Sequence, residues 1–405
     1  MKDVAIIGGG PAGLMAAEVI ATAGVPVALY ERRQTPGRKF LMAGRGGLNL
    51  THSEDMPDFM RRYGNAAATL APIIAEFSPL MLRAWCEGLR EPTFVGTSGR
   101  VFPQSFKASP LLRAWRSRLD SLGVRFLLQH DWQGWADDSA LIFSSPDGEV
   151  KAKPAATVLA LGGASWPKLG ADGNWTKIMA QKNIPVSPLL PANCGFAVEW
   201  SDVFRNKFAG SPLKQVTLSF ADISVKGEVM ITEKGLEGGI VYAVSALLRC
   251  EIMRKGSVTF TLDLKPDLSS TVLLARLQTP RAAKSFSNFL REKGGLSPAA
   301  VGLLQENRSA HDYTPEALTA LIKAFPVYST APFSIDRAIS TAGGIPFTAL
   351  DDHLMLKDKP GVFAAGEMLD WEAPTGGYLL QGTFSTAVRA AKGALAWVGN
   401  SKSKM

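Results

Sequence analysis

The chain has few cysteines and no long hydrophobic run. Its three cysteines among 405 residues, Cys86, Cys194 and Cys250, lie far apart and form no CxxC pair. This scatter argues against a disulfide framework, a zinc site or a redox-active dithiol, so we assign no metal ligand. No apolar run approaches the roughly 18 residues needed to cross a bilayer. Because an apolar strand pattern starts almost at the first residue, we expect no signal peptide and a cytoplasmic protein without a membrane partner.

The charge balance is basic, and one segment lacks acidic residues altogether. The chain has 44 Lys and Arg residues against 36 Asp and Glu residues, a net charge of +8. Residues 32–53 contain five cationic side chains and no acidic one, namely Arg32, Arg33, Arg38, Lys39 and Arg45. Such a cluster is typical of a segment that neutralises phosphate groups. No basic motif interleaved with aromatic residues is present, so we do not expect nucleic acid as a partner.

What is present at the N-terminus is a βαβ pattern. An apolar run at 4–7 enters a Gly8-x-Gly10-x-x-Gly13 turn, an Ala-rich helical segment follows, and a second apolar run ends in Glu31. This is the dinucleotide-binding fingerprint with strand, helix and acid in their required places. We expect Gly8 to permit the tight turn, Gly10 to admit a pyrophosphate and Gly13 to allow close helix packing.

The neighbours of this turn predict an adenosine dinucleotide. Pro11 and Ala12 open a helix whose free N–H groups and positive dipole end would face the phosphates. Glu31 can accept hydrogen bonds from both ribose hydroxyls and would repel a 2′-phosphate. Arg32 adds positive charge directly after it. These features favour ADP-ribose over its 2′-phosphorylated form.

A second glycine-rich segment, residues 37–52, predicts further contacts to the cofactor. Arg38 and Lys39 could reach phosphates, and Gly46 and Gly47 could let backbone approach a flat ring. The alternative is a mobile surface loop, which is the usual role of such a composition. His52, at its end, is an acid or base near the ring or an ordinary polar loop residue.

The C-terminal segment predicts the remaining half of the site. An apolar run at 362–365 ends in Gly366-Glu367, and Gly376-Gly377 precedes a helix expected from about residue 381. The carboxylate would accept from ribityl hydroxyls, and the helix dipole would stabilise negative charge on reduced flavin. Nicotinamide binding needs no such second half-site. The expected cofactor is therefore non-covalent FAD.

The hydrophobic period changes along the chain. Residues up to about 187 read as α/β, and from 188 the alternation of period two predicts antiparallel strands. Residues 267–325 are expected to be helical, with starts at Ser297-Pro298 and Thr314-Pro315. From residue 362 the α/β pattern returns. A second domain is thus expected inside a split dinucleotide-binding domain.

Taken together, five stretches resemble a known family, the aminoacetone-oxidase-like and BaiN-like NAD(P)/FAD-dependent oxidoreductases. They are residues 8–13 with Glu31, 37–52, 99–108, 161–170, and 338–344 with 361–381. The resemblance implies an α/β fold: a Rossmann-like FAD-binding domain (1–188 and 350–405) interrupted by a β-barrel-like domain (189–265 and 327–349) and a helical subdomain (266–326). Leu48 stands where the family often has Cys, and Leu379 where it often has Asn. Both differences favour the aminoacetone-oxidase-like branch.

The motifs and the resemblance together define a set of expected cofactor-binding residues, whereas no catalytic acid or base is assigned. Tyr378 is expected to contact the flavin or to pack in the core, and the backbone of Trp132 is expected to cover the adenine. The full set is Gly8, Gly10, Pro11, Ala12, Gly13, Glu31, Arg32, Arg38, Lys39, Gly46, Gly47, Leu48, Asn49, Trp132, Leu161, Gly162, Gly163, Gly366, Glu367, Gly376, Gly377, Tyr378, Leu379 and Leu380.

Four functions are compatible with these features. The first is an FAD-dependent oxidoreductase acting on a small organic substrate, with an amine oxidised by O₂ as the specific expectation. The second is an NAD(P)H-dependent reductase of a conjugated double bond; the absence of a second GxGxxG motif argues against a stable nicotinamide domain. The third is a flavin-dependent RNA-modifying protein, and the fourth is a module in which FAD is structural or a redox sensor.

Overall fold

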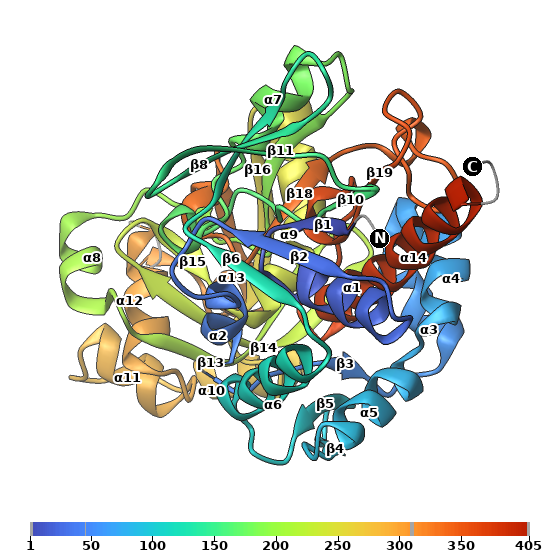
Figure 1. Ribbon diagram of the computed structural model, residues 1–405. Coiled ribbons are helices and arrows are strands. Elements are labelled where there is room, and N and C mark those ends of the chain that lie inside the picture. Colours follow the sequence, from blue (N-terminus) through green and yellow to red (C-terminus); the bar gives the residue numbers. More distant parts are fainter. Residues whose placement is uncertain (1–2, 45, 308–311, 403–405) are drawn as a thin grey trace. The chain divides into compact units, whose positions relative to one another are not determined.

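The computed structural model describes residues 3–44, 46–307 and 312–402 (Figure 1). The chain divides into two compact units. Unit 1 comprises Met1–Leu190 and Ser340–Met405, and unit 2 comprises Pro191–Ile339. Each unit has its own hydrophobic core.

Unit 1 is built on a parallel sheet of five strands. The strand order is β19-β10-β1-β2-β6, and every neighbouring pair is parallel. Its central strands are buried on both faces, as expected for the continuous apolar runs. The strands are β1 (Val4–Ile7), β2 (Val27–Glu31), β6 (Arg125–Leu128), β10 (Ala156–Leu159) and β19 (Val362–Ala364). The predicted Rossmann-like α/β core is confirmed.

Helices cover one face of this sheet and a small antiparallel sheet covers the other. Helix α1 (Pro11–Thr22) packs on the face of Ile6, and α14 (Tyr378–Lys402) packs beside α1. Tyr30 points to the opposite face, where its ring stacks on Phe143 at 4.0 Å between centroids. Phe143 belongs to the sheet of β7 (Asp131–Trp135), β8 (Leu141–Ser145) and β9 (Gly148–Ala152).

The remaining elements of unit 1 include two further small sheets and the helices between them. A three-stranded sheet has the order β3-β5-β4, and β11 pairs with β18. Their bounds are α2 (Arg38–Ala43), β3 (Thr51–His52), α3 (Met56–Arg61), η1 (Gly64–Ala66), α4 (Ala67–Glu76), α5 (Pro79–Gly88), β4 (Thr93–Val95), β5 (Arg100–Pro103), α6 (Ala108–Ser121), η2 (Pro167–Leu169), α7 (Trp175–Gln181), β11 (Ser187–Ala192), β18 (Ser340–Gly344), η5 (Phe347–Ala349) and η6 (Gly366–Met368).

One stretch, Gly64–Gly88, is long and apolar enough to cross a membrane by length and composition alone. It comprises η1, α4 and α5, and the Ser78 side chain caps α5 by accepting from the N–H of Met81. Leu70, Ile74 and Leu82 of this stretch lie in the unit 1 core. This length and composition do not by themselves indicate a membrane helix, because the core helices of other proteins have the same length and composition.

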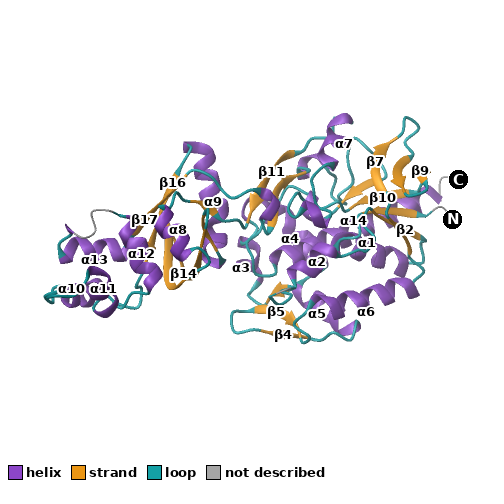
Figure 2. Ribbon diagram, turned by 90° about the vertical axis from the view of Figure 1, so that its left-hand side faces the viewer, coloured by secondary structure: helices purple, strands orange, loops and turns teal. Residues whose placement is uncertain are grey.

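Unit 2 is an antiparallel half-barrel with helices on both sides of its sheet. The strand order is β12-β15-β14-β13-β16-β17. Helix α9 (Gly239–Lys255) packs on one side, and the helical group α10–α13 lies on the other (Figure 2). The other bounds are β12 (Phe196–Ala197), α8 (Asp202–Phe208), β13 (Pro212–Phe220), β14 (Ile223–Thr232), β15 (Gly235–Glu237), β16 (Val258–Asp263), α10 (Ser270–Leu277), α11 (Phe286–Glu292), α12 (Pro298–Glu306), α13 (Pro315–Lys323), β17 (Phe325–Ser329) and η4 (Ile335–Arg337).

Two expected boundaries differ in the structure. Residues 340–349 belong to unit 1 instead of the insert, because β18 pairs with β11 and the N–H of Thr341 donates to Glu367. Helix α14 begins at Tyr378, three residues before the expected start. The predicted helix starts after Ser297 and Thr314 are correct.

Candidate FAD site

The turn between β1 and α1 depends on its glycines. A Cβ on Gly8, where φ is +106°, would lie 2.3 Å from the carbonyl oxygen of Ala160. A Cβ on Gly13 would lie 1.9 Å from the carbonyl oxygen of Gly8. Gly10 differs, because a Cβ there would meet no described atom within 4 Å. The fold therefore needs Gly8 and Gly13, whereas Gly10 leaves open space where the fingerprint predicts a pyrophosphate.

Glu31 ends β2 beside this turn. Its carboxylate accepts hydrogen bonds from the N–H groups of Gly9 at 2.7 Å and Arg33 at 2.8 Å. Burial raises the pKa of Glu31 above its usual value, and these two N–H donors oppose the rise only in part. The carboxylate is thus held in place by the backbone.

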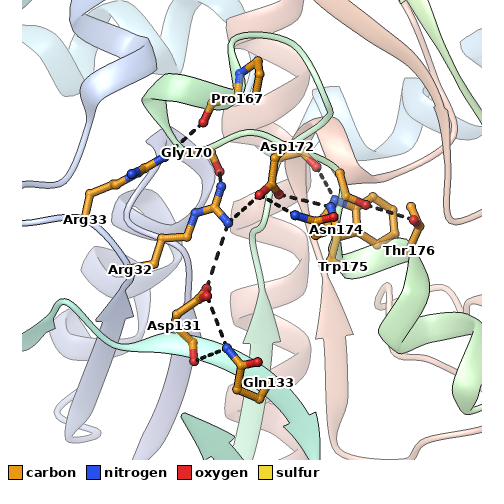
Figure 3. Close-up of polar contacts among 12 residues, drawn as sticks. Arg32, Arg33, Asp131, Gln133, Pro167, Gly170, Asp172, Asn174, Trp175 and Thr176 are labelled. Carbon is orange, nitrogen blue, oxygen red and sulfur yellow. Dashed lines mark hydrogen bonds and ion pairs between the residues drawn. The ribbon is translucent and has the colours of Figure 1, made fainter. Parts of the chain in front are cut away.

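Arg32 and Arg33, which directly follow β2, bind the loop that follows β10 (Figure 3). Arg32 forms an ion pair with Asp172 at 2.8 Å and donates to the carbonyl oxygen of Gly170 at 2.6 Å. Arg33 donates to the carbonyl oxygen of Pro167 at 3.0 Å. We call residues 162–174 the strap. They begin after β10 and are bound by the arginines that follow β2. Because β1 lies between β10 and β2 in the sheet, the strap crosses the carboxyl end of β1. Arg32 was expected to bind the cofactor, and the structure shows it holding the strap.

Glu367 joins three segments of unit 1. It accepts hydrogen bonds from Lys39 Nζ at 2.6 Å, the N–H of Thr341 at 3.0 Å and the N–H of Gly163 at 3.3 Å. Lys39 also donates to Ser165 Oγ at 2.6 Å. Lys39 is predicted to bind the phosphates, and Glu367 is predicted to bind the ribityl chain. In the structure their side chains form an ion pair with each other.

The other predicted residues around Glu367 lie close by. Leu161 directs its N–H to Met368 Sδ at 3.5 Å, and the carbonyl oxygen of Gly162 accepts from Trp175 Nε1 at 2.9 Å. A Cβ on Gly366 would approach the Cβ of Ala12 to 2.8 Å, so the C-terminal motif contacts the start of α1. Arg38 is exposed at the start of α2.

Residues 46–52, which end in β3, and the Gly376-Gly377 turn are in direct contact, although they are more than 300 residues apart in sequence. A Cβ on Gly377 would lie 2.5 Å from the backbone of Thr51. Two buried polar atoms of residues 46–52, Asn49 Oδ1 and Thr51 Oγ1, have no partner among the described residues. We call Gly46–His52 with Gly376–Tyr378 the flavin loop pair. Leu48 is fully buried within it, and Arg45 lies outside the described residues.

Three of the residues expected to bind the cofactor pack in unit 1. They are Trp132, Leu379 and Leu380. Trp132 is buried in β7 and meets Trp135 edge to face at 4.7 Å, while its Nε1 has no partner among the described residues. Leu379 and Leu380, in the first turn of α14, pack against the core. Their contacts with FAD stay predictions.

A polar cluster around Tyr378 was not predicted from the sequence. The Tyr378 hydroxyl donates to Glu54 Oε1 at 2.6 Å, and Arg62 donates to both oxygens of Glu54. His52 stacks on the Tyr378 ring at 5.4 Å, and the Tyr63 hydroxyl donates to the Tyr378 carbonyl oxygen at 2.7 Å. The spacing of Glu54 and Arg62 carries no motif, so only their contacts reveal them.

Electrostatics in this cluster keep the Tyr378 phenol protonated. Burial, and then the hydrogen bond to Glu54, raise the pKa of Tyr378 well above its usual 10.0. Burial opposes ionisation of Glu54, but the hydrogen bonds from Arg62 and Tyr378 outweigh it and lower the pKa of Glu54. Tyr378 is therefore a neutral donor fixed by an ionised acceptor.

These residues fit an FAD molecule. Gly10 leaves space at the helix start, and the carboxylates of Glu31 and Glu367 are the acceptors that would bind the ribose and the ribityl chain. The unpartnered Asn49 Oδ1 suits a cofactor whose ring edge carries an N–H donor. The parallel sheet with this two-part site defines a dinucleotide-binding flavoprotein fold.

The comparison of sequences identifies the family. The HI0933-like protein Rossmann domain matches residues 2–393, and the chain belongs to this family. It is therefore an FAD-dependent oxidoreductase with FAD as its cofactor. The 3-dehydro-bile acid delta(4,6)-reductase of Clostridium scindens is 23% identical over 97% of this chain and 99% of its own. The ribosomal RNA dihydrouridine synthase of Escherichia coli is 25% identical over 97% of this chain and 98% of its own.

Solved structures share the fold over nearly the whole chain. The 3-ketosteroid-delta4-(5alpha)-dehydrogenase of Rhodococcus jostii RHA1 has a TM-score of 0.53 at 14% identity, covering 97% of this chain and 96% of that one. The open conformation of a flavocytochrome c3 fumarate reductase has a TM-score of 0.52 at 15% identity, covering 98% and 78%. At this identity the likeness establishes the fold alone.

Proposed function

We propose that this protein reduces a C=C bond conjugated to a carbonyl group, with Tyr378 as the proton donor. The single observation that carries the proposal is the Tyr378 phenol, held protonated by burial and by its 2.6 Å hydrogen bond to Glu54. It directly follows the Gly376-Gly377 turn expected at the flavin. This was the second of the four functions compatible with the sequence.

Saturation of such a bond requires a hydride at the β-carbon and a proton at the α-carbon. Bound FAD, once reduced, supplies the hydride. A neutral phenol can supply the proton, because a carbanion beside a carbonyl group is a far stronger base than a phenolate. Arg62 keeps Glu54 ionised and fixed, and Tyr63 holds the backbone of Tyr378. Tyr378 is thus positioned from two sides and regains its proton from solvent after each turnover.

The relatives support the same reaction class. One is named for reduction at the 4,6 positions of a 3-dehydro-bile acid, and the other for synthesis of dihydrouridine. Both names denote saturation of a C=C bond conjugated to a carbonyl group. Since each relative spans this chain almost completely, the shared chemistry is a reasonable basis for the proposal.

Oxidation of an amine with O₂ is the alternative, and it rests on the family resemblance. It needs no proton donor, so it assigns no role to the Tyr378 cluster. The second substrate of the reductase would be NAD(P)H, bound at a transient site. The second substrate of the oxidase would be O₂.

The experiment begins with FAD-loaded protein, mixed anaerobically with NADH or NADPH. Bleaching of the flavin band, followed by its recovery on adding a cyclic enone or uridine, is the expected result. An amine panel is tested in parallel with oxidised protein in air. Peroxide formation with an amine, and no recovery with any conjugated acceptor, would replace the proposal by the oxidase.

A further inference from the structure

Both ring nitrogens of His52 are bound to the backbone. Nδ1 accepts a hydrogen bond from the N–H of Glu54 at 3.1 Å, and Nε2 lies 2.9 Å from the carbonyl oxygen of Ser98. Because a carbonyl oxygen can only accept, Nε2 carries the hydrogen and Nδ1 carries none. The two backbone partners thus hold His52 as a neutral imidazole. A hydrogen on Nδ1 would break the bond from Glu54, and Glu54 Oε2, at 4.0 Å, is too far to replace it.

The turn between β4 and β5 is shaped to hold this ring. At Gly99 φ is +78°, and a Cβ there would lie 2.6 Å from Cε1 of His52. His52 pairs with Arg100 across β3 and β5, and the N–H of Ser53 donates to the carbonyl oxygen of Gly99 at 2.8 Å. Residues 99–108 are one of the five stretches that carry the family resemblance, and this contact gives their first residues a role.

The His52 ring also packs on the proposed proton donor. The rings of His52 and Tyr378 are stacked, with centroids 5.4 Å apart and planes inclined by 22°. Phe59 contacts the same Tyr378 ring at 5.0 Å and 57°. Glu54, two residues after His52, accepts the Tyr378 phenol hydrogen at 2.6 Å. His52 therefore contacts the ring of the donor and the backbone of its acceptor, and its side chain is only 15% exposed.

We infer that His52 is a positioning residue for the reduction and is neither an acid nor a base in it. Its ring orients Tyr378 by stacking, and its Nδ1 fixes the backbone of Glu54. Ser98 and Gly99 hold the ring itself. Proton transfer is fast only when donor and acceptor atoms are correctly placed, so the rate depends on these contacts. The inference rests on the proposed function, since it assigns His52 a part in the reaction only through Tyr378.

NMR of FAD-loaded protein with tyrosine isotopically labelled at Cζ tests the positioning without any redox step. The chain has six tyrosines, and Tyr378→Phe identifies the Tyr378 signal by its loss. His52→Leu and Gly99→Ala should shift or broaden this signal, because the phenol loses its fixed geometry. The matched control for Gly99→Ala is Gly123→Ala, where φ is +76° and no described atom lies within 4 Å of a Cβ.

The flavin absorbance of each variant shows that it is folded and loaded. An unchanged Tyr378 signal in both His52→Leu and Gly99→Ala would overturn the inference. In His52→Gln the amide N–H₂ can replace Nε2 as the donor to Ser98, so this variant should keep the wild-type signal.

Reoxidation of the reduced protein by a cyclic enone shows whether His52 transfers a proton. His52→Leu should slow this step roughly 10- to 100-fold, whereas His52→Gln should stay within about threefold of wild type. The pH profile of His52→Gln should match that of wild type, although an amide cannot exchange a proton in this range. A slow His52→Gln with an unshifted Tyr378 signal would make His52 an acid or base and overturn the inference, and the reductase proposal would survive. Conversely, Tyr378 signals that respond as expected, with no reduction of any conjugated acceptor, would refute the reaction and leave the positioning of Tyr378 by His52 intact.

Discussion

The two ends of the candidate FAD site are built in different ways. The adenosine end, Gly8–Gly13 with Glu31, comes from one βαβ unit, and backbone N–H groups hold its carboxylate. The flavin loop pair brings together segments more than 300 residues apart, and its Tyr378 hydroxyl is held by the side chain of Glu54, which Arg62 fixes in turn. A site held by backbone can be predicted from local spacing, whereas one held by side chains from distant segments cannot.

The largest expected effect lies at the flavin end. Tyr378→Phe should slow reoxidation of the reduced protein by a conjugated acceptor 10²- to 10⁴-fold, as expected for loss of a general acid. FAD occupancy and the rate of flavin reduction should stay unchanged, since the ring is kept. Stopped-flow absorbance measures both half-reactions, with Tyr242→Phe in unit 2 as the control. A rate within twofold of wild type would remove Tyr378 from the reaction.

Gly10→Val separates folding from cofactor binding at the adenosine end. No described atom lies near its Cβ, so the apoprotein should unfold at nearly the wild-type temperature. The added side chain fills the space of the pyrophosphate and should cost about 3 kcal/mol, or roughly 100-fold in the Kd for FAD. Calorimetry and titration of apoprotein with FAD measure the two quantities, and Gly239→Val is the matched control. Equal affinity would mean that the dinucleotide lies elsewhere.

Glu31→Ala should weaken FAD binding about 10- to 100-fold at neutral pH, the value of one charged ribose contact. Burial raises the pKa of Glu31 above 4.5 in the apoprotein, so protonation competes with ribose binding as the pH falls through that raised pKa. Wild-type affinity should therefore fall on mild acidification, while Glu31→Ala should show no such dependence. Parallel pH profiles of the two proteins would contradict this role.

The smallest expected effect concerns the ion pair between Lys39 and Glu367. Both side chains are partly exposed, at 26% and 16%, so Lys39→Met should lower the stability of the apoprotein by only about 0.5 kcal/mol. Glu367 keeps the N–H groups of Thr341 and Gly163. Thermal unfolding measures the change, and Lys151→Met, which breaks the exposed pair with Glu149, should have no effect. A loss of several kcal/mol would mean that Glu367 depends on Lys39 for its position.

Much of the fold followed from local patterns. The βαβ unit of β1, α1 and β2 was predicted from the fingerprint, and the antiparallel strands of the insert were predicted from alternation such as that of residues 216–220. The sequence places the return to the FAD-binding domain at residue 350, whereas unit 1 resumes at Ser340, because the pairing of β18 with β11 is a long-range contact that leaves no local signal.

The unpredicted parts of the site share one cause. Glu54, Arg62 and Tyr63 gain their meaning only from contact with Tyr378, which is more than 300 residues away. The role of His52 depends in the same way on Ser98 and Gly99, which the pairing of β3 with β5 brings beside it.

We expect the strap to affect the rate at which FAD dissociates as well as the affinity for FAD. Residues 162–174 cross the edge where the phosphates are expected, and Arg32 and Arg33 fasten them to the segment that follows Glu31. For a dinucleotide bound at this edge, we expect entry and exit to require opening of the contact between Arg32 and Asp172. Salt and the loss of Arg32 would therefore accelerate exchange of FAD in both directions, and kinetic retention would be governed by residues that need not touch the cofactor at all.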